Sequence, residues 1–186
     1  RSCSSAASDV YKRQPQNRMA NTASLASPSV RSYVRAYVRD LLAAYPDVTG
    51  FRPDWPEYTC YKLDEAFQDF GPHVERWAEE RGFDFARIRR EVGALYDLLH
   101  GGLRNEHLAD WASPERGRFS LLNALRAYPG IAEWLRLKAA LSVDLLAEWR
   151  AALTAYGGED KKLSANAFMP PFTLFTGFDF TGAARH

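Results

Sequence analysis

A short apolar run from Val48 to Phe51 begins two residues after an amphipathic helix, and it constrains the fold of this chain more than any other feature. The helix is predicted over residues 31–45, where apolar side chains recur at three- and four-residue spacing and Pro46 ends the pattern. A two-residue link between a helix and a strand is typical of parallel α/β units. We therefore expect residues 48–51 to form a strand that pairs with a parallel neighbour.

Three charged residues follow this strand within six positions, namely Arg52, Asp54 and Glu57. Because successive side chains of a strand point to opposite faces, Gly50, Arg52 and Asp54 are predicted to share one face. Catalytic groups at the carboxyl ends of parallel strands are the arrangement of a βα-barrel active site. The predicted fold class is therefore α/β: a partial (β/α)8 TIM-barrel fragment with a large helical insertion between two parallel strands.

The second strand is predicted over residues 162–168, where small apolar residues alternate with Ser164 and Asn166. Between the two strands the pattern is helical for about a hundred residues, far more than one barrel helix needs. The expected organisation has a barrel segment at 15–61, a helical insertion or lid at 62–158, and a barrel strand and loop at 159–186. Because a complete barrel typically needs about 250 residues, we expect the chain to be truncated.

Residues 1–14 are expected to be an adapter-derived artefact. Ser4 to Gln14 resembles the in-frame translation of a transposon-type sequencing adapter over eleven codons; a natural Ser/Ala-rich leader is the alternative. Without residues 1–14, the 24 basic and 23 acidic residues become 21 and 22, and the formal charge changes from +1 to −1. Nothing in this charge favours a nucleic-acid partner. Cys60 is then the single cysteine, and no apolar run has the length of a membrane span, so we expect no internal disulfide and no membrane association.

Three blocks of sequence, at 27–45, 45–58 and 163–180, carry a family resemblance. Together they resemble a group of poorly characterised TIM-barrel proteins classed as glycoside-hydrolase-like. The strand motif Gly50-Phe51-Arg52-Pro53-Asp54 is also similar to one in the α-amylase clan, whose Asp is the nucleophile and whose Arg holds it. This chain departs from that clan at Trp55, where the clan has a small residue, and at Asn166, where the clan would have the acid. The resemblance implies a carbohydrate-active enzyme that cleaves glycosidic bonds.

Glycoside hydrolysis needs two carboxyl groups across the scissile bond. Asp54 fits the ionised member, because Arg52 on the same face favours its charged form. Glu57 fits the general acid, because burial beneath Trp55 and Tyr58 would raise its pKa. The alternative is that Arg52 and Asp54 form a buried structural ion pair and that Glu57 is a solvated loop carboxylate.

Further residues are predicted to bind the substrate, an oligo- or polysaccharide. Aromatic rings could stack on sugars or fill the core, Asn166 could bind a hydroxyl group or satisfy polar groups inside the protein, and Asp179 could bind substrate or cap a helix. The rings considered are Trp55, Tyr58, Tyr61, Phe172 and Phe175. No cofactor or metal is expected, because His73 and His107 lack a second ligand at a fixed spacing. Two alternatives stay open: a non-catalytic carbohydrate-binding barrel, and a different TIM-barrel hydrolase or lyase.

Overall fold

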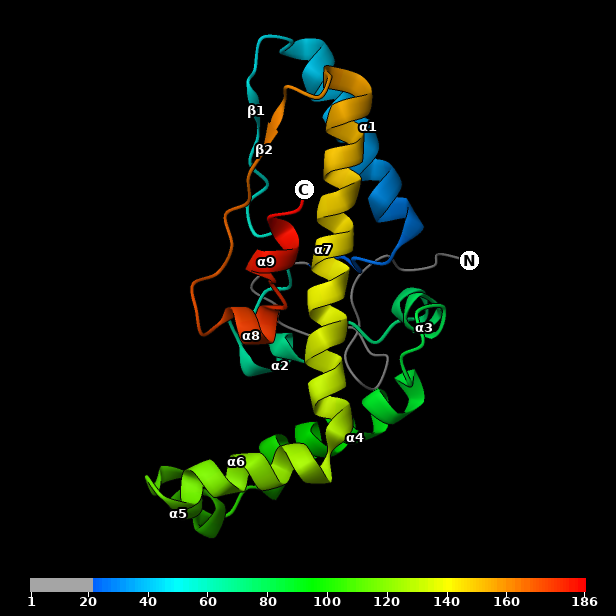
Figure 1. Cartoon of the computed structure of the whole chain (residues 1–186). Helices are drawn as coiled ribbons and strands as arrows, with labels where there is room; N and C mark the ends of the chain where they lie inside the picture. The colour runs from blue at the N-terminus through cyan, green and yellow to red at the C-terminus, as the bar shows by residue number, and fades with distance from the viewer. Residues whose placement is uncertain (1–21) are drawn as a thin grey trace.

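A computed structural model describes residues 22–186, apart from the side chains at 63, 118–121, 124 and 125. The predicted adapter-derived segment at 1–14 lies outside the described residues. The elements follow in chain order (Figure 1): α1 (Pro28–Ala44), β1 (Gly50–Phe51), α2 (Leu63–Ala66), α3 (Pro72–Glu79), α4 (Phe85–Asp97), the π-helix η1 (Leu98–Gly102), α5 (Asn105–Ala112), α6 (Arg116–Ala127), α7 (Pro129–Gly157), β2 (Lys162–Leu163), α8 (Thr173–Thr176) and α9 (Phe180–Ala183).

The predicted TIM-barrel fragment is wrong. The structure is mostly helical, with 61 % of the chain in helices, and the sheet within the described residues consists of β1 and β2 alone. The two strands are parallel, as their links to the preceding helices suggest, but each has only two residues. The helices between them pack on one another and on α7 instead of covering a wider sheet, and this packing is what the sequence pattern does not reveal.

Helix α7 is the central element, and α1 packs along its C-terminal half (Figure 1). Arg31, near the start of α1, is paired with Asp144, whereas Leu42, near the end of α1, lies where a Cβ at Gly157 would meet it at 3.0 Å. The two helices therefore run in the same direction. Their contact is apolar, with Val38, Leu42, Ala152 and Leu153 all buried.

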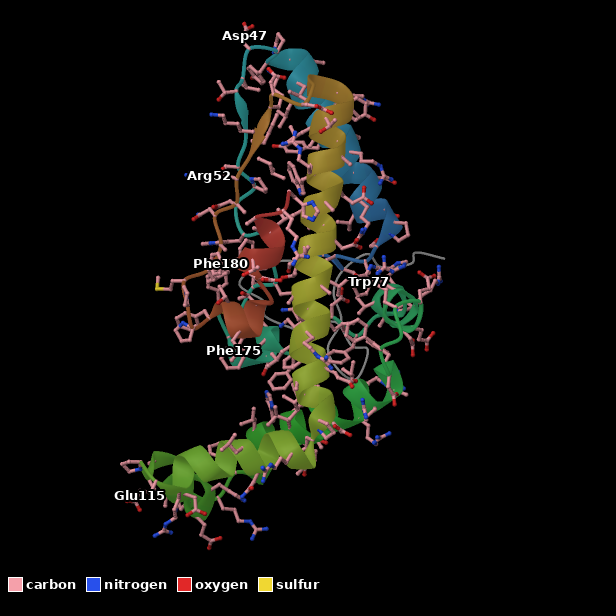
Figure 2. All side chains as sticks on the ribbon, in the orientation of Figure 1. Asp47, Arg52, Trp77, Glu115, Phe175 and Phe180 are labelled. Atoms are coloured by element: carbon pink, nitrogen blue, oxygen red, sulfur yellow. The ribbon has the colours of Figure 1, made fainter. Side chains whose placement is uncertain are left out.

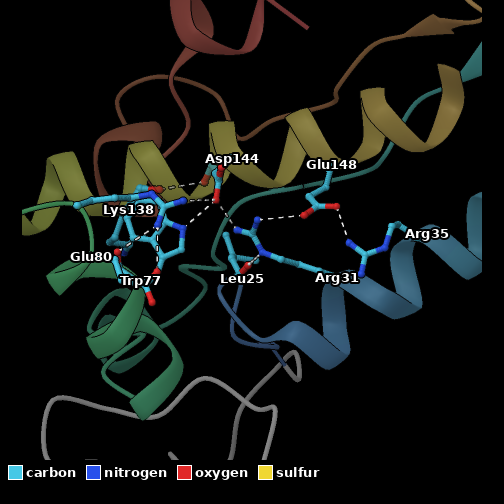
Figure 3. Close-up of polar contacts among 10 residues, drawn as sticks. Leu25, Arg31, Arg35, Trp77, Glu80, Lys138, Asp144 and Glu148 are labelled. Atoms are coloured by element: carbon cyan, nitrogen blue, oxygen red, sulfur yellow. Dashed lines mark hydrogen bonds and ion pairs between the residues drawn. The ribbon is translucent and has the colours of Figure 1, made fainter. Parts of the chain in front are cut away.

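Ion pairs flank this apolar contact (Figure 3). The guanidinium of Arg31 lies 2.9 Å from Asp144 and 3.5 Å from Glu148, and Arg35 lies 2.7 Å from Glu148. Trp77 of α3 donates from its indole nitrogen to Asp144 at 2.8 Å. Because Arg31 is largely buried, solvent screens its pairs less than it screens ordinary surface pairs. The network joins α1, α3 and α7.

The strand pair lies beside α1 and α7, and each strand follows one of these helices. Gly50 pairs with Lys162 and Phe51 with Leu163. A side chain at Gly50 would place its Cβ 2.0 Å from the Lys162 carbonyl oxygen, so the close approach of the strands requires glycine there. Phe51 and Leu163 pack toward the helices, whereas the opposite face is open to solvent.

The larger core lies around the N-terminal half of α7. It combines residues of α3, α4 and α7 with residues that precede position 62, among them Leu25, Val34 and Tyr58. The predicted division at residue 62 stays a prediction; the core takes residues from both sides of it. Helices α5 and α6 form a hairpin that extends away from the rest (Figure 1). Among residues 22–186, no helix combines the length and the apolar composition that a membrane crossing needs.

Candidate functional site

Asp54 and Asn166 meet just beyond the ends of β1 and β2. An isolated parallel bridge joins their backbones, because Asn166 donates to the Pro53 carbonyl at 3.1 Å and Trp55 donates to the Asn166 carbonyl at 2.7 Å. The Asn166 side chain donates from Nδ2 to Asp54 Oδ1 at 2.5 Å. Both residues are exposed. The strand pairing therefore brings two predicted site residues, 112 positions apart in sequence, into direct contact.

Arg52 lies two residues before Asp54 on the open face of the strand pair (Figure 2). Its side chain is exposed, and no ion pair joins it to Asp54 in the described part of the chain. The partner of Asp54 is an amide, which donates a hydrogen bond without adding charge. Among the described residues, the structure therefore shows neither the alternative of a buried Arg52–Asp54 ion pair nor the contact by which Arg52 would orient Asp54.

Trp55 begins a cluster of three aromatic rings. Its indole stacks on Phe168 with centroids 4.9 Å apart, and Tyr61 packs edge-on against both rings at 5.7 Å. Trp55 and Tyr61 are 41 % and 40 % exposed. Trp55 also has a φ of +49°, a left-handed conformation that is strained for a bulky residue and found mostly where function maintains it. Phe172 and Phe175 are exposed on or beside α8 but make no described contact with this cluster.

Glu57, three residues after Asp54, is only 3 % exposed. Its Oε1 accepts a hydrogen bond from the Phe168 backbone at 2.7 Å, and its Oε2 is buried without a hydrogen-bond partner in the described residues. Burial raises the pKa of this carboxyl, the Phe168 hydrogen bond opposes the rise, and the negative charge of Asp54 adds to it. The rise has the direction that the sequence predicts for a general acid.

Two other residues that were predicted to bind substrate make contacts that stabilise the fold. Tyr58 is completely buried, and its hydroxyl donates to Asp69 Oδ2 at 3.3 Å, so its ring belongs to the core and is closed to a ligand. Asp179 is the N-cap of α9 and accepts from the Thr181 backbone at 3.0 Å. This is the helix-capping alternative for Asp179, and no described hydrogen bond connects it to Asp54 or Glu57.

Sequence reasoning missed Lys138, which is the most unusual titratable residue near the site. It is 1 % exposed, and Nζ donates to the carbonyl oxygens of Ala66, at 2.8 Å, and Phe175. Burial lowers the pKa of Lys138 to about 7. The sequence pattern could have indicated that this lysine is buried, because Lys138 falls in register with Trp134 and Leu141 on the apolar face of the longest helix.

The described residues contain no group of three or more His, Cys, Asp or Glu side chains that could hold a metal ion. Comparison of the chain with protein-family models, curated proteins and solved structures gave no match. The resemblance to glycoside-hydrolase-like proteins therefore stays a prediction, and the functional argument rests on the geometry of the site.

Proposed function

We propose that the end of the strand pair binds a carbohydrate and hydrolyses its glycosidic bond. The observation that carries this proposal is the contrast between two neighbouring carboxyl groups. Glu57 is buried and holds its proton to a higher pH than usual, whereas Asp54 is exposed and hydrogen-bonded to an amide. Glycoside hydrolysis uses two carboxyl groups in unlike environments, one as general acid and the other as nucleophile or base.

In this proposal Glu57 donates its proton to the glycosidic oxygen as the bond from that oxygen to the anomeric carbon breaks. Asp54 stabilises the positive charge that develops on the sugar, and a water oxygen finally bonds to the anomeric carbon. Either Asp54 first bonds to the carbon and water then displaces it, with the Glu57 carboxylate taking the proton of the water, or water attacks directly and Asp54 takes that proton. The configuration of the released sugar distinguishes the two routes. Asn166 keeps the Asp54 carboxylate in position.

The aromatic cluster supplies the binding surface. Trp55, Tyr61 and Phe168 present partly exposed rings beside the two carboxyl groups, and flat apolar rings suit the apolar faces of sugars. A second candidate function is carbohydrate binding without turnover. It is favoured by the burial of Glu57 Oε2, which in this arrangement a substrate oxygen does not reach.

The test measures hydrolysis of 4-nitrophenyl α- and β-glycosides, and binding of malto- and cello-oligosaccharides by calorimetry. For a glycoside that the wild type cleaves, Asp54→Asn should lower turnover by about 10²–10⁴-fold, the usual contribution of a positioned carboxylate. Asp47→Asn is the matched control, because Asp47 is exposed at the opposite end of β1 (Figure 2).

Unchanged turnover in Asp54→Asn would contradict the hydrolytic role. Binding that Trp55→Ala weakens, with no turnover of any glycoside, would support the second candidate instead. If the wild type neither binds nor cleaves any of these probes, both candidates fail for neutral glucans and simple glycosides.

A further inference from the structure

Lys138 is a buried amine that no carboxylate of the described residues pairs with. Its Nζ lies 4.7 Å from the centroid of the Trp134 ring and 5.2 Å from that of Tyr58, and no described carboxylate lies within 4.0 Å of it. Two carbonyl oxygens, those of Ala66 and Phe175, accept its hydrogen bonds. The two carbonyl oxygens and the two ring faces give some support to an ammonium, but no carboxylate and no bulk water offset its charge at a side chain that is 1 % exposed.

Few charged groups face Nζ from the surrounding elements. Cys60 and Asp69, from the segment between β1 and α3, are the two whose charges favour the ammonium, and Tyr58 presents its ring. Glu57 and Glu65 act on Cys60. Helix α8 offers a backbone carbonyl and has no titratable side chain.

Lys138 holds α8 in place, and α8 in turn holds the candidate site. The Phe175 carbonyl of α8 accepts from Lys138, while the next carbonyl, that of Thr176, accepts from the Tyr58 backbone at 3.1 Å. Gly177, with a φ of +82°, lies so close to α7 that a Cβ there would meet the Lys138 Cβ at 2.5 Å. Further back in the same segment, Phe168 donates to Glu57 and completes the ring cluster.

The segment 168–178 therefore contacts Glu57 through the Phe168 backbone and α7 through the hydrogen bond from Lys138 to Phe175. We propose that Lys138 is a proton-controlled latch, which holds segment 168–178 against Glu57 as a neutral amine and releases it on protonation. The claim that this motion controls access to Glu57 rests on the proposed function. The claim that segment 168–178 opens on protonation of Lys138 does not.

The direction of the pH dependence follows from the two environments of the amine. In the closed arrangement the pKa of Lys138 is about 7, because burial disfavours the charge more than Cys60 and Asp69 favour it. Once α8 moves away and water reaches Nζ, the pKa returns toward about 10.4. The open state binds the proton more tightly, so the open fraction should rise as the pH falls from about 10 to about 7, by up to tenfold per pH unit, and then stay constant.

Amide hydrogen exchange of the full chain, read by mass spectrometry with rapid quenching, measures this opening. Protection factors, which correct for the intrinsic pH dependence of exchange, report the free energy of local opening. In the wild type, protection of residues 168–178 should increase by up to about 100-fold between pH 7 and pH 9. In Lys138→Met, which cannot titrate, it should not change with pH.

Lys161→Met is the matched control. Lys161 also donates to two backbone carbonyls, those of Pro46 at 2.8 Å and Val48 at 2.6 Å, but at the other end of the strand pair. This variant should keep the wild-type pH dependence at 168–178. If Lys138→Met does not fold, NMR of ¹³Cε-labelled lysine in the wild type tests the proposal instead. One of the five lysines should then titrate near pH 7.

Three results would each overturn the latch. The first is protection in the wild type that does not depend on pH, and the second is a wild-type pH dependence in Lys138→Met. The third is a spectrum in which all five lysines titrate near pH 10. None of these readouts uses a substrate. Failure of the proposed hydrolysis would therefore leave the latch intact, and failure of the latch would leave the roles of Asp54 and Glu57 to be tested by turnover.

Discussion

Asp54 and Glu57 are separated by two residues, yet one is exposed and the other is buried. The backbone explains the difference. Trp55 has a φ of +49°, which ends the strand alternation directly after Asp54 and turns the chain inward. Pro56 and Glu57 are then buried, and the Glu57 carboxyl reaches the Phe168 backbone. One strained residue thus gives two neighbouring carboxyl groups opposite environments.

The environment of Glu57 predicts a pH-dependent contribution to stability. Burial raises the pKa of Glu57 above its ordinary value of 4.5, so the folded state binds this proton more tightly than the unfolded chain does. The stabilisation is present in full below pH 4.5 and is lost as the pH rises through the folded-state pKa. Because Glu57→Gln stays neutral, the free energy of unfolding of the wild type, minus that of Glu57→Gln, should decrease over this range.

Urea unfolding of both proteins at several values between pH 4 and pH 8 gives this difference directly. Subtracting the variant removes the contribution of Asp69, whose pKa is also raised by burial. Glu159→Gln replaces an exposed carboxyl in the turn before β2 and serves as the control. A difference between wild type and Glu57→Gln that does not change with pH would show that Glu57 is solvated in solution.

At the scale of elements, α7 is the best predicted part of the chain. The apolar periodicity predicts a helix at 131–156, and the structure has one at Pro129–Gly157, with Pro129 in its first turn and Gly158 as its C-cap. The sequence also predicts a helix at 64–81 that is broken or kinked at Gly71-Pro72, and the structure has two separate helices, α2 and α3. Pro72 begins α3 in this structure, because proline fits the first turn of a helix, where its missing N–H needs no partner.

The contact between α1 and α7 should carry much of the stability near the strand pair. Leu153 is fully buried against Val38 and Leu42. Leu153→Ala should lower the free energy of unfolding by about 2–5 kcal/mol, because it removes buried methyl groups and leaves a cavity. Leu108→Ala, at a half-exposed position of α5, is the matched control and should change the free energy by less than about 0.5 kcal/mol.

Urea unfolding monitored by far-UV circular dichroism measures both variants. If Leu153→Ala were as mild as Leu108→Ala, then α1 and α7 would not pack in solution as they do in the structure. Because β1 and β2 follow these two helices, such a result would also remove the support for the Asp54–Asn166 contact.

The candidate site is only partly readable from the sequence. The spacing of Arg52 and Asp54 on a strand, and the alternation around Asn166, predict which side chains share the open face, and Asp54 and Asn166 do meet there. The role of Lys138 depends instead on Ala66 and Phe175, which are distant in sequence. A local pattern holds no information on such partners.

At the scale of the whole molecule, the predicted TIM-barrel fold class is wrong, because the number of strands in a sheet depends on contacts between residues far apart in sequence. A helix followed closely by a strand predicts parallel pairing, and β1 and β2 are parallel. The same pattern does not state how many strands join, or whether the intervening helices cover a sheet. Here α4 buries its apolar face against α7, α3 packs on α4, and a helical core results that also includes Tyr58 and residues around α1.

The helical core leaves α5 and α6 outside. These two helices contact mainly each other, and α6 also contacts α7 (Figure 1). On α5, Leu108 and Trp111 are exposed, as is Leu122 on α6. We expect that replacing residues 104–127 with a short Gly/Ser linker leaves the remaining core folded, because all the described side chains of both apolar clusters lie outside this range. The free energy of unfolding should change by about 1 kcal/mol or less, since a flexible loop of modest length costs little to close.

Urea unfolding and hydrogen exchange of the shortened chain test this expectation. A single cooperative transition, with unchanged protection at 55–58 and 168–178, would show that the hairpin is independent of the candidate site. Loss of the cooperative unfolding transition would mean that α5 and α6 stabilise the N-terminal end of α7. They would then also stabilise the buried environment of Trp134 and Lys138. The second result would make the hairpin part of the support for the latch, because Lys138 lies only two and a half turns from the start of α7.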